Sequence, residues 1–350
     1  MPRPLSTTRT PPWWWRMGLC GWALAWAGAL QARPADCAAH PPIPWQAVVP
    51  GVWAWPPEAP GDIDPGNQGH VATTSVVVDG GEALVVDPGP SHAHGWRVRQ
   101  SLLCRFGARV RWVVNSHAHA ENVLGNSAFA DLQATGTLDI VASTGTLMAM
   151  RERCPVCLAS LVQRLGEPVM HGTHTVLPNR GLATGDVLRV GALAIEVLAL
   201  EQGHTESDLL LWLARGRVLW AGGLVYEQRL PELAQGSLDG WLRALDHLER
   251  LRPQVLIHHA VSFAPDAEHP PAAMQATRTY LARLRQRVWQ AMDAGRFAQE
   301  DEAVQMPEYA LWAGYAERQS FNTQRAWREL EPLWFGAAAP PGGSAPDVRR

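Results

Sequence analysis

The chain has 350 residues, 47% of them hydrophobic, which is enough to bury a sizeable core in one large domain or two small ones. The formal net charge is −3, and all 30 lysine or arginine positions are arginine. This balance excludes a strongly basic surface of the kind that binds nucleic acid, so no nucleic-acid partner is predicted.

The first 29 residues have the pattern of a secretory signal peptide. Three arginines, the last of them Arg16, precede an apolar run over 17–29 that ends in Ala-Gly-Ala. The run is too short for an ordinary membrane-spanning helix. We therefore predict export to the periplasm or beyond, cleavage near Ala29 or Ala32, and no stable membrane insertion afterwards. An uncleaved anchor is the alternative.

Strands and helices alternate along the rest of the chain. Residues 30–50, rich in proline and alanine, are predicted to be a linker. Apolar runs bounded by turn residues predict strands over 51–56, 71–79, 83–87, 108–114, 138–143, 192–200, 208–214, 217–222 and 254–260. Helical spacing predicts helices over 92–105, 121–133, 145–165, between Ser237 and Pro253, and over 277–291 and 307–333. This order predicts an α/β (α+β) fold in which two sheets pack face to face with helices outside.

The same pass along the chain predicts the domain boundaries. A sheet-containing domain is expected over 51–265, followed by a helical extension packed on it over 266–335. Residues 336–350 are rich in proline, glycine and alanine and are predicted to be a disordered tail.

Four cysteines remain after the expected cleavage, namely Cys37, Cys104, Cys154 and Cys157. An oxidising compartment permits disulfides. Because only two residues separate Cys154 from Cys157, we predict a local disulfide between them. An inert pair, a redox-active pair and two metal-binding thiolates are the alternatives.

Two histidines directly follow the strand predicted over 108–114. His117 and His119 are two residues apart, and alternate side chains on extended backbone point the same way, so both imidazoles can face one point. His204 leaves another strand end and can supply a third imidazole. Three neutral imidazoles form a catalytic zinc set that lowers the pKa of a bound water to about 7. A pair of histidines without any metal is the alternative, since exposed pairs are common.

Three motifs resemble those of the metallo-β-lactamase superfamily. S-H-A-H-A-E-N-V-L-G-N-S-A-F (116–129) is similar to the His-x-His-x-Asp-His signature of that superfamily. G-H-T-E-S-D-L (203–209) resembles its third-histidine motif, and V-D-P-G (86–89) resembles its early strand-end motif. R-C-P-V-C-L (153–158) and the helical C-terminal part are similar to a periplasmic branch, the zinc metallohydrolases of quinoprotein relay systems or sulfur oxidation. The resemblance implies an αββα sandwich of two mixed β-sheets with outer helices.

The resemblance also implies a reduced metal site. The first metal's ligands fall on His117, His119 and His204. The second metal's ligands are usually Asp, His, a bridging Asp and a final His, and their positions carry Glu121, Asn122, Gly223 and His259. Glutamate shifts the carboxylate, asparagine is a poor zinc ligand and glycine has no ligand atom. About one zinc ion per chain is therefore expected. Restoring Asp, His and Asp at positions 121, 122 and 223 is expected to create a second site beside His259.

Other polar residues have less specific roles. Asp208 is expected either to orient His204 or to cap its loop. Asp87 resembles a structural aspartate that ties the metal-site loops together. At most one of the adjacent His258 and His259 is expected to face the cleft. The remaining candidates are expected to be loop residues, namely His92, His94, His171 and His174.

Together these patterns predict an exported zinc-dependent hydrolase of a small ester, thioester, lactone or lactam. Water would be activated at His117, His119 and His204, with Glu121 orienting or deprotonating it and His259 as a further ligand. Fold analogy does not choose among these substrates. The alternatives are a non-catalytic or degenerate metal-binding accessory protein of a periplasmic quinoprotein or sulfur-oxidation pathway, and a redox protein that uses its C-P-V-C pair. No oligomeric state is predicted.

Overall fold

The computed structural model describes residue 37 and residues 42–298 and 304–338. The predicted signal peptide over 1–29, its cleavage positions and the part of the predicted tail over 339–350 lie outside the described residues. None of the helices in the described ranges combines the length and the apolar composition needed to cross a bilayer.

The first sheet is mixed and has seven strands in the order β1-β2-β3-β4-β5-β6-β7. Their bounds are β1 Gln46–Val49, β2 Val52–Trp55, β3 Thr74–Asp79, β4 Glu82–Val86, β5 Arg109–Val114, β6 Asp139–Ser143 and β7 Arg180–Leu182. The pairs from β1 to β4 are antiparallel and those from β4 to β7 are parallel. Parallel neighbours require crossover connections, and helices supply them after β4, β5 and β6.

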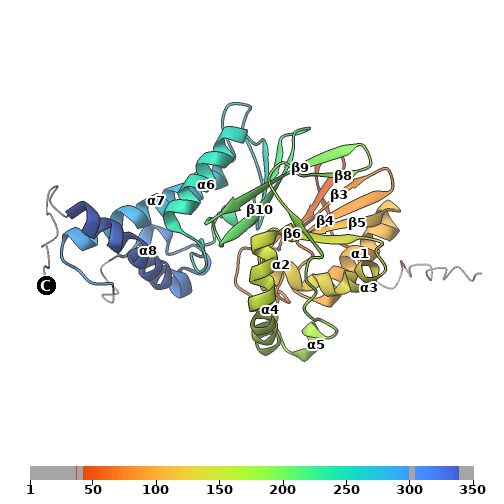
Figure 1. The fold of residues 1–350 in the computed structure, drawn as a ribbon, viewed down its shortest axis with the longest axis horizontal. Helices are drawn as coiled ribbons and strands as arrows, with labels where there is room; N and C mark the ends of the chain where they lie inside the picture. The colour runs from red at the N-terminus through yellow and green to blue at the C-terminus, as the bar shows by residue number, and fades with distance from the viewer. Residues whose placement is uncertain (1–36, 38–41, 299–303, 339–350) are drawn as a thin grey trace, which may run out of the picture. The chain divides into compact units, whose positions relative to one another are not determined.

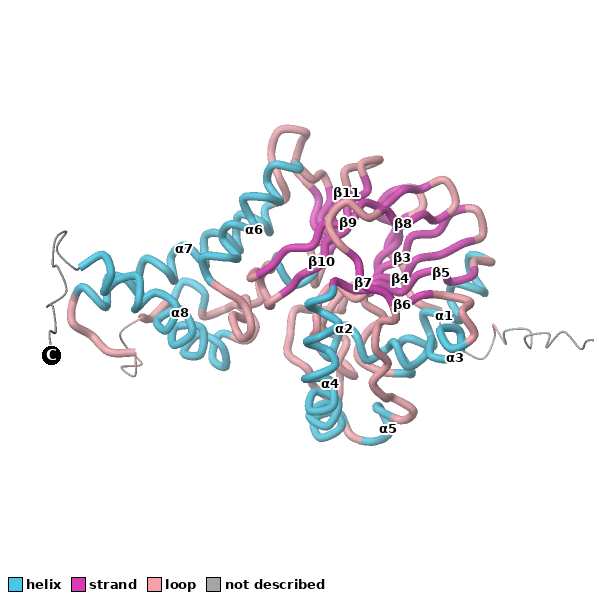
Figure 2. The backbone as a smooth tube through the Cα atoms, viewed as in Figure 1, coloured by secondary structure: helices cyan, strands magenta, loops and turns pink. Residues whose placement is uncertain are grey.

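The second sheet is also mixed and has six strands in the order β13-β12-β11-β10-β9-β8. Their bounds are β8 Val187–Val190, β9 Leu193–Glu201, β10 Ser207–Leu213, β11 Val218–Trp220, β12 Val255–Ile257 and β13 Val261–Phe263. All pairs are antiparallel except β11 with β12. Figure 2 shows the strands of both sheets in magenta.

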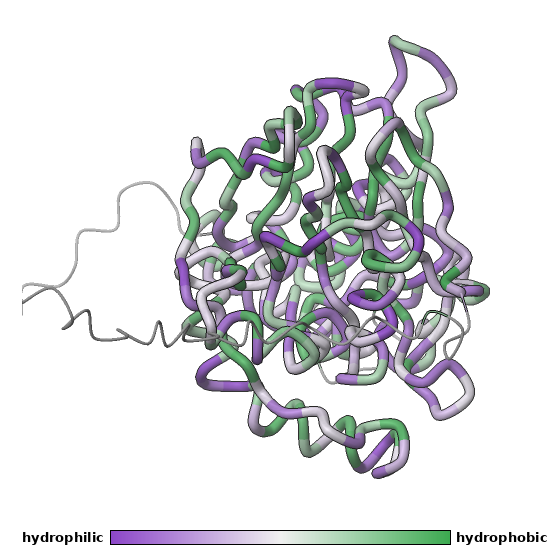
Figure 3. The backbone as a smooth tube through the Cα atoms, turned by 90° about the vertical axis from the view of Figure 1, so that its right-hand side faces the viewer, coloured by the Kyte–Doolittle hydropathy of each residue, from purple (hydrophilic) through white to green (hydrophobic). Residues whose placement is uncertain are grey.

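The core between the two sheets follows from alternation along the strands. In β10, Leu209 and Leu211 belong to the core that both sheets share, whereas Leu210 belongs to the core on the helical side. In β5, Val114 faces the shared core and Val113 faces the opposite side. Figure 3 shows apolar segments in green alternating with hydrophilic segments in purple along the chain. Each sheet therefore buries both of its faces.

Helices cover the outer faces of both sheets (Figure 1). Helix α1 (His92–Phe106) packs Val98 and Leu102 on the first sheet. The second sheet is covered by α6 (Leu238–Leu251), α7 (Ala272–Asp293) and α8 (Tyr315–Ala338). The remaining helices are α2 Ala120–Val123, η2 Leu124–Phe129, α3 Ala130–Ala134, α4 Thr144–Leu165, α5 Glu167–Met170, η3 Gly222–Leu224 and η4 Pro307–Tyr309. The predicted αββα sandwich of two mixed sheets is confirmed.

Several element boundaries differ from the predictions. Strand β1 lies within the stretch predicted to be a linker, and β7, β8 and β13 were not predicted, because short strands with exposed residues show little apolar periodicity. The helix predicted over 121–133 is divided into α2, η2 and α3. Gly125 lies in η2, where its N–H donates to Gly89 O at 2.7 Å and its missing side chain lets it approach Pro88. Helix α8 begins at Tyr315, later than predicted, and runs to Ala338, into the predicted tail.

The cysteine prediction was wrong. The disulfide joins Cys37 to Cys104 of α1, with Cα atoms 5.6 Å apart, and Cys154 and Cys157 are not joined to each other. Both lie in the middle of α4, where Cβ atoms three residues apart are roughly 5–6 Å apart. A disulfide needs Cβ atoms about 3.5–4.5 Å apart. Burial raises the pKa of the Cys154 thiol to about 12, which also disfavours a redox or metal-binding thiolate there.

Candidate metal centre

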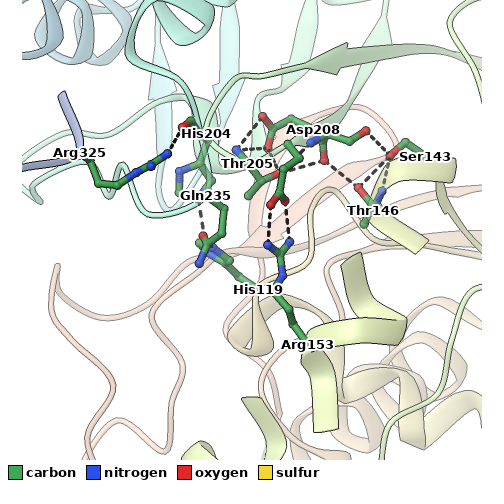
Figure 4. Close-up of polar contacts among 12 residues, drawn as sticks. His119, Ser143, Thr146, Arg153, His204, Thr205, Asp208, Gln235 and Arg325 are labelled. Atoms are coloured by element: carbon green, nitrogen blue, oxygen red, sulfur yellow. Dashed lines mark hydrogen bonds and ion pairs between the residues drawn. The ribbon is translucent and has the colours of Figure 1, made fainter. Parts of the chain in front are cut away.

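Three histidines converge where the end of β5 in the first sheet lies beside β10 in the second sheet. His117 and His119 follow the end of β5, and His204 lies in the loop between β9 and β10. The Leu209 N–H of β10 donates to Ser116 O at 2.7 Å and joins these two segments. The ring centroids lie 4.7 to 4.9 Å apart, and one ring nitrogen of each histidine lies within 4.8 Å of the others. His119 and His204 are drawn in Figure 4.

The hydrogen bonds of the rings leave one lone pair on each of two histidines turned toward the cluster. Ser116 Oγ donates its proton to Asp87 Oδ2 at 2.6 Å, so the Nδ1–H of His117 donates to Ser116 Oγ at 2.8 Å, and Nε2 of His117 keeps its lone pair. His119 Nε2–H donates to Gln235 Oε1 at 2.9 Å, which leaves the lone pair on Nδ1 (Figure 4). That Nδ1 lies 3.4 Å from His204 Nε2.

The donor set fits a transition-metal ion. Burial lowers the pKa values of both His117 and His204 well below the ordinary value, so both rings are neutral at neutral pH. Neutral imidazole is the form that binds metal, and three such rings suit zinc and its neighbours in the first transition series. The metal is therefore supported by the donor chemistry, while its identity belongs to the proposal below.

Asp87 holds the loops of the site together. Its carboxylate accepts hydrogen bonds from Ser116 N–H at 2.8 Å, from Ser116 Oγ–H and from Asn122 Nδ2–H at 3.0 Å. Burial raises its pKa to about 6, although these bonds act in the opposite direction. This is the structural role that the motif predicts. Because the Asn122 amide donates to the Asp87 carboxylate, the Asn122 side chain is turned toward Asp87.

Asp208 caps the loop that carries His204. Its carboxylate accepts hydrogen bonds from the Thr205 N–H at 3.1 and 3.2 Å and from the Thr205 hydroxyl at 2.9 Å (Figure 4). Burial raises its pKa to about 7. Of the two roles expected for Asp208, the structure shows loop capping.

The four positions of the second metal line one small cavity of about 30 Å³. Glu121 Oε1 lies 3.9 Å from His119 Nδ1 at the edge of this cavity. The ring nitrogens of His259 face His258 Nδ1 at 3.2 Å and the Glu227 carbonyl at 3.1 Å, and its ring stacks on Tyr226. Neither Glu121 nor His259 belongs to the three-histidine group. Their predicted roles therefore remain predictions.

The position of His204 depends on Gly223. A Cβ atom built on Gly223 would lie 2.1 Å from Cδ2 and 2.6 Å from Nε2 of His204, so the imidazole occupies the space of a side chain at 223. An aspartate at 223 would displace this histidine. The expectation that Asp at position 223 helps to create a second site beside His259 remains a prediction, and it requires the His204 ring to shift. The motif comparison shows only that a ligand is missing there, not that the space is filled.

The other histidines of the described residues do not belong to the three-histidine group. His258 Nε2 contacts Ser262 Oγ at 2.8 Å. His92 and His94 lie in α1, not in a loop as predicted, and His94 stacks on Trp55 with ring centroids 4.3 Å apart. His171 and His174 lie outside helices and strands, as predicted.

Sequence reasoning missed Gln235 and Arg229. Gln235 is 116 residues from the histidine that it orients, and neither residue lies in a recognised metal-ligand motif. Both line a larger cavity of about 320 Å³ beside the histidines, together with His119 and Glu121. Arg229 begins the stretch R-L-P-E-L (229–233), but this sequence does not predict a buried guanidinium.

The sequence finds no match among protein-family models or curated proteins. Solved structures do match. The chain is similar to a metallo-β-lactamase from Pontibacter korlensis (TM-score 0.51, 18% identity, 68% of this chain and 98% of that chain) and to the DIM-1 metallo-β-lactamase (0.51, 18%, 69% and 98%). It is also similar to the metallo-β-lactamase FIM-1 from Pseudomonas aeruginosa in its mono-zinc form (0.50, 19%, 72% and 98%). At such identities the likeness shows the fold alone. Together with the two mixed sheets and their outer helices, it establishes that this chain has the metallo-β-lactamase fold.

Proposed function

We propose that this chain is a metal-dependent hydrolase that holds one zinc ion at His117, His119 and His204. The observation that carries the proposal is the convergence of three imidazoles, with centroids 4.7 to 4.9 Å apart, on one point beside a cavity. When bound, zinc supplies a water of lowered pKa and polarises a carbonyl oxygen.

The chain's own residues supply orientation and proton transfer. Ser116 and Gln235 fix the rings of His117 and His119 so that their lone pairs face the same point. Glu121 lies beside them at the wall of the larger cavity. A carboxylate in this place can accept a proton from the attacking water and return it to the leaving group.

The cavity of about 320 Å³ beside His119 supports a small-molecule substrate, since ligand pockets in proteins start at roughly 300 Å³. We propose a small ester, thioester, lactone or lactam. A zinc-loaded preparation assayed against a panel of these four classes tests the proposal. Stoichiometric zinc without turnover of any class would instead favour the non-catalytic accessory role. The quinoprotein or sulfur-oxidation branch of the superfamily remains a prediction from sequence resemblance.

Glu121→Gln is expected to lower kcat about 10²–10⁴-fold on whichever panel substrate is turned over, because the amide cannot accept a proton. The zinc content should not change, since Glu121 is outside the three-histidine group. Steady-state kinetics and elemental analysis of the same sample check both statements. Glu232→Gln is the matched control, because Glu232 lines the same cavity but pairs with Arg318. Unchanged kcat in Glu121→Gln would remove Glu121 from the mechanism.

We also propose that the protein is exported, and the Cys37–Cys104 bond supports an oxidising compartment. Protein from the native host is expected to begin near residue 30 or 33 and to carry this bond.

The bond closes a loop with a sequence separation of 67, so Cys104→Ser should lower the free energy of unfolding by about 4 kcal/mol. Intact-mass analysis and urea unfolding check these outcomes, with Cys157→Ser as the control. An intact N-terminus or free thiols at both positions would contradict export.

A further inference from the structure

We propose that the buried guanidinium of Arg229 takes the place of a second metal ion beside the three histidines, keeps the site mononuclear and binds the carboxylate of the substrate or product. This inference rests on the proposed function and concerns a residue outside the three-histidine group.

The cavity lined by the four second-metal positions has a volume of about 30 Å³, which is room for about one water-sized group. Arg229 lines this cavity and also the larger cavity of about 320 Å³, and Glu121 is likewise shared by both. Arg229 is therefore shared by the cavity of the second-metal positions and by the space proposed for the substrate.

The Arg229 charge is buried without full compensation. The residue is only 6% exposed, and its Nε has no hydrogen-bond partner among the described residues. Its polar contacts are long, with Nη2 3.8 Å from Asp62 Oδ1 and Nη1 3.4 Å from Val71 O, and its Cζ lies 5.9 Å from the centroid of the Tyr226 ring. Asp62 is shared, because it also pairs with Arg318. A buried cation in this state favours a further anionic partner and disfavours a nearby divalent cation.

The remaining second-metal positions do not restore a competing site. The Asn122 amide is held by Asp87, and the space beside Gly223 is filled by His204. Glu121 and His259 remain, with the arginine beside them. Hydrolysis of an ester, thioester, lactone or lactam always produces a carboxylate, and a fixed guanidinium is the side chain best suited to pair with that group.

The first test adds metal ligands at the second-metal positions and leaves Gly223 unchanged. Glu121→Asp with Asn122→His restores two family ligands, which together with His259 would make three. This double variant should still hold about one zinc ion, and adding Arg229→Met should raise the content to about two, whereas adding Arg229→Lys should leave it at about one. Elemental analysis after dialysis gives the counts, and circular dichroism checks the fold. Two zinc ions in the double variant alone, or one after Arg229→Met, would overturn the proposal.

A second measurement avoids the double variant in case it does not fold. In the otherwise unmodified chain loaded with Co²⁺, Arg229→Met should weaken the binding of acetate at least about 10-fold, and Arg229→Lys should weaken it less, as followed by visible absorption. Unchanged acetate affinity in Arg229→Met would overturn the proposal. Failure of the proposed function has a different signature, since no panel substrate would then be hydrolysed, while the zinc difference caused by Arg229→Met in the double variant would still report on Arg229.

Discussion

Gly223→Ala is expected to abolish tight zinc binding although it removes no ligand atom. The added methyl group would lie 2.1 Å from His204 Cδ2, and His204 is fully buried, so its ring must leave the position from which it faces the other two imidazoles. We expect zinc affinity to fall at least about 100-fold, which is the upper end of the effect of changing an outer-shell residue. Competition with a chromophoric zinc chelator measures this affinity.

Gly61→Ala is the matched control for this substitution. A Cβ atom on Gly61 meets no atom within 4 Å, so the same change should leave zinc affinity unaltered. Circular dichroism on both variants separates a local displacement from unfolding. Gly223→Ala protein that is folded and still binds zinc like the unmodified chain would show that His204 is not required where the structure places it.

His117→Ala is expected to remove both zinc binding and any hydrolysis that the unmodified chain performs. Two imidazoles leave the ion under-coordinated, and loss of a ligand costs more than the about 10–100-fold of an outer-shell change. His117 is buried and its Nδ1–H is held by Ser116, so the substitution removes the Nε2 lone pair that faces the other two imidazoles. Elemental analysis and the ester panel give the two outcomes.

His94→Ala serves as the control because it also deletes a buried imidazole, but one that stacks on Trp55 in the first sheet's outer core and lies outside the three-histidine group. It should keep its zinc. Loss of zinc in both variants would indicate a general loss of structure, and retention of zinc in His117→Ala would remove this histidine from the site.

The sequence predicts those parts of the site that depend on local spacing. His117 and His119 are two residues apart at a strand end, so extended backbone alone directs them to one side, and the motif around His204 supplies the third ring. The sheets could be predicted for the same reason, since strands such as β5 and β10 contain the apolar runs 112–114 and 209–213.

Features that depend on distant pairing could not be predicted in this way. Cys37 pairs with a cysteine 67 positions away, whereas short spacing favoured the two cysteines of α4. Gln235 and Arg229 reach the site from a loop with no ligand motif. The motif comparison identifies Gly223 as a missing ligand, but only the coordinates show that His204 fills its space.

The zinc content of the unmodified chain tests the central claim most directly. Protein loaded with excess zinc and dialysed without chelator should keep about one ion per chain, held by three imidazoles. Two ions per chain would contradict the account, because Glu121 and His259 would then have recruited ligands beside Arg229. No bound zinc after loading would contradict it as well, because the convergence of His117, His119 and His204 would then serve no metal.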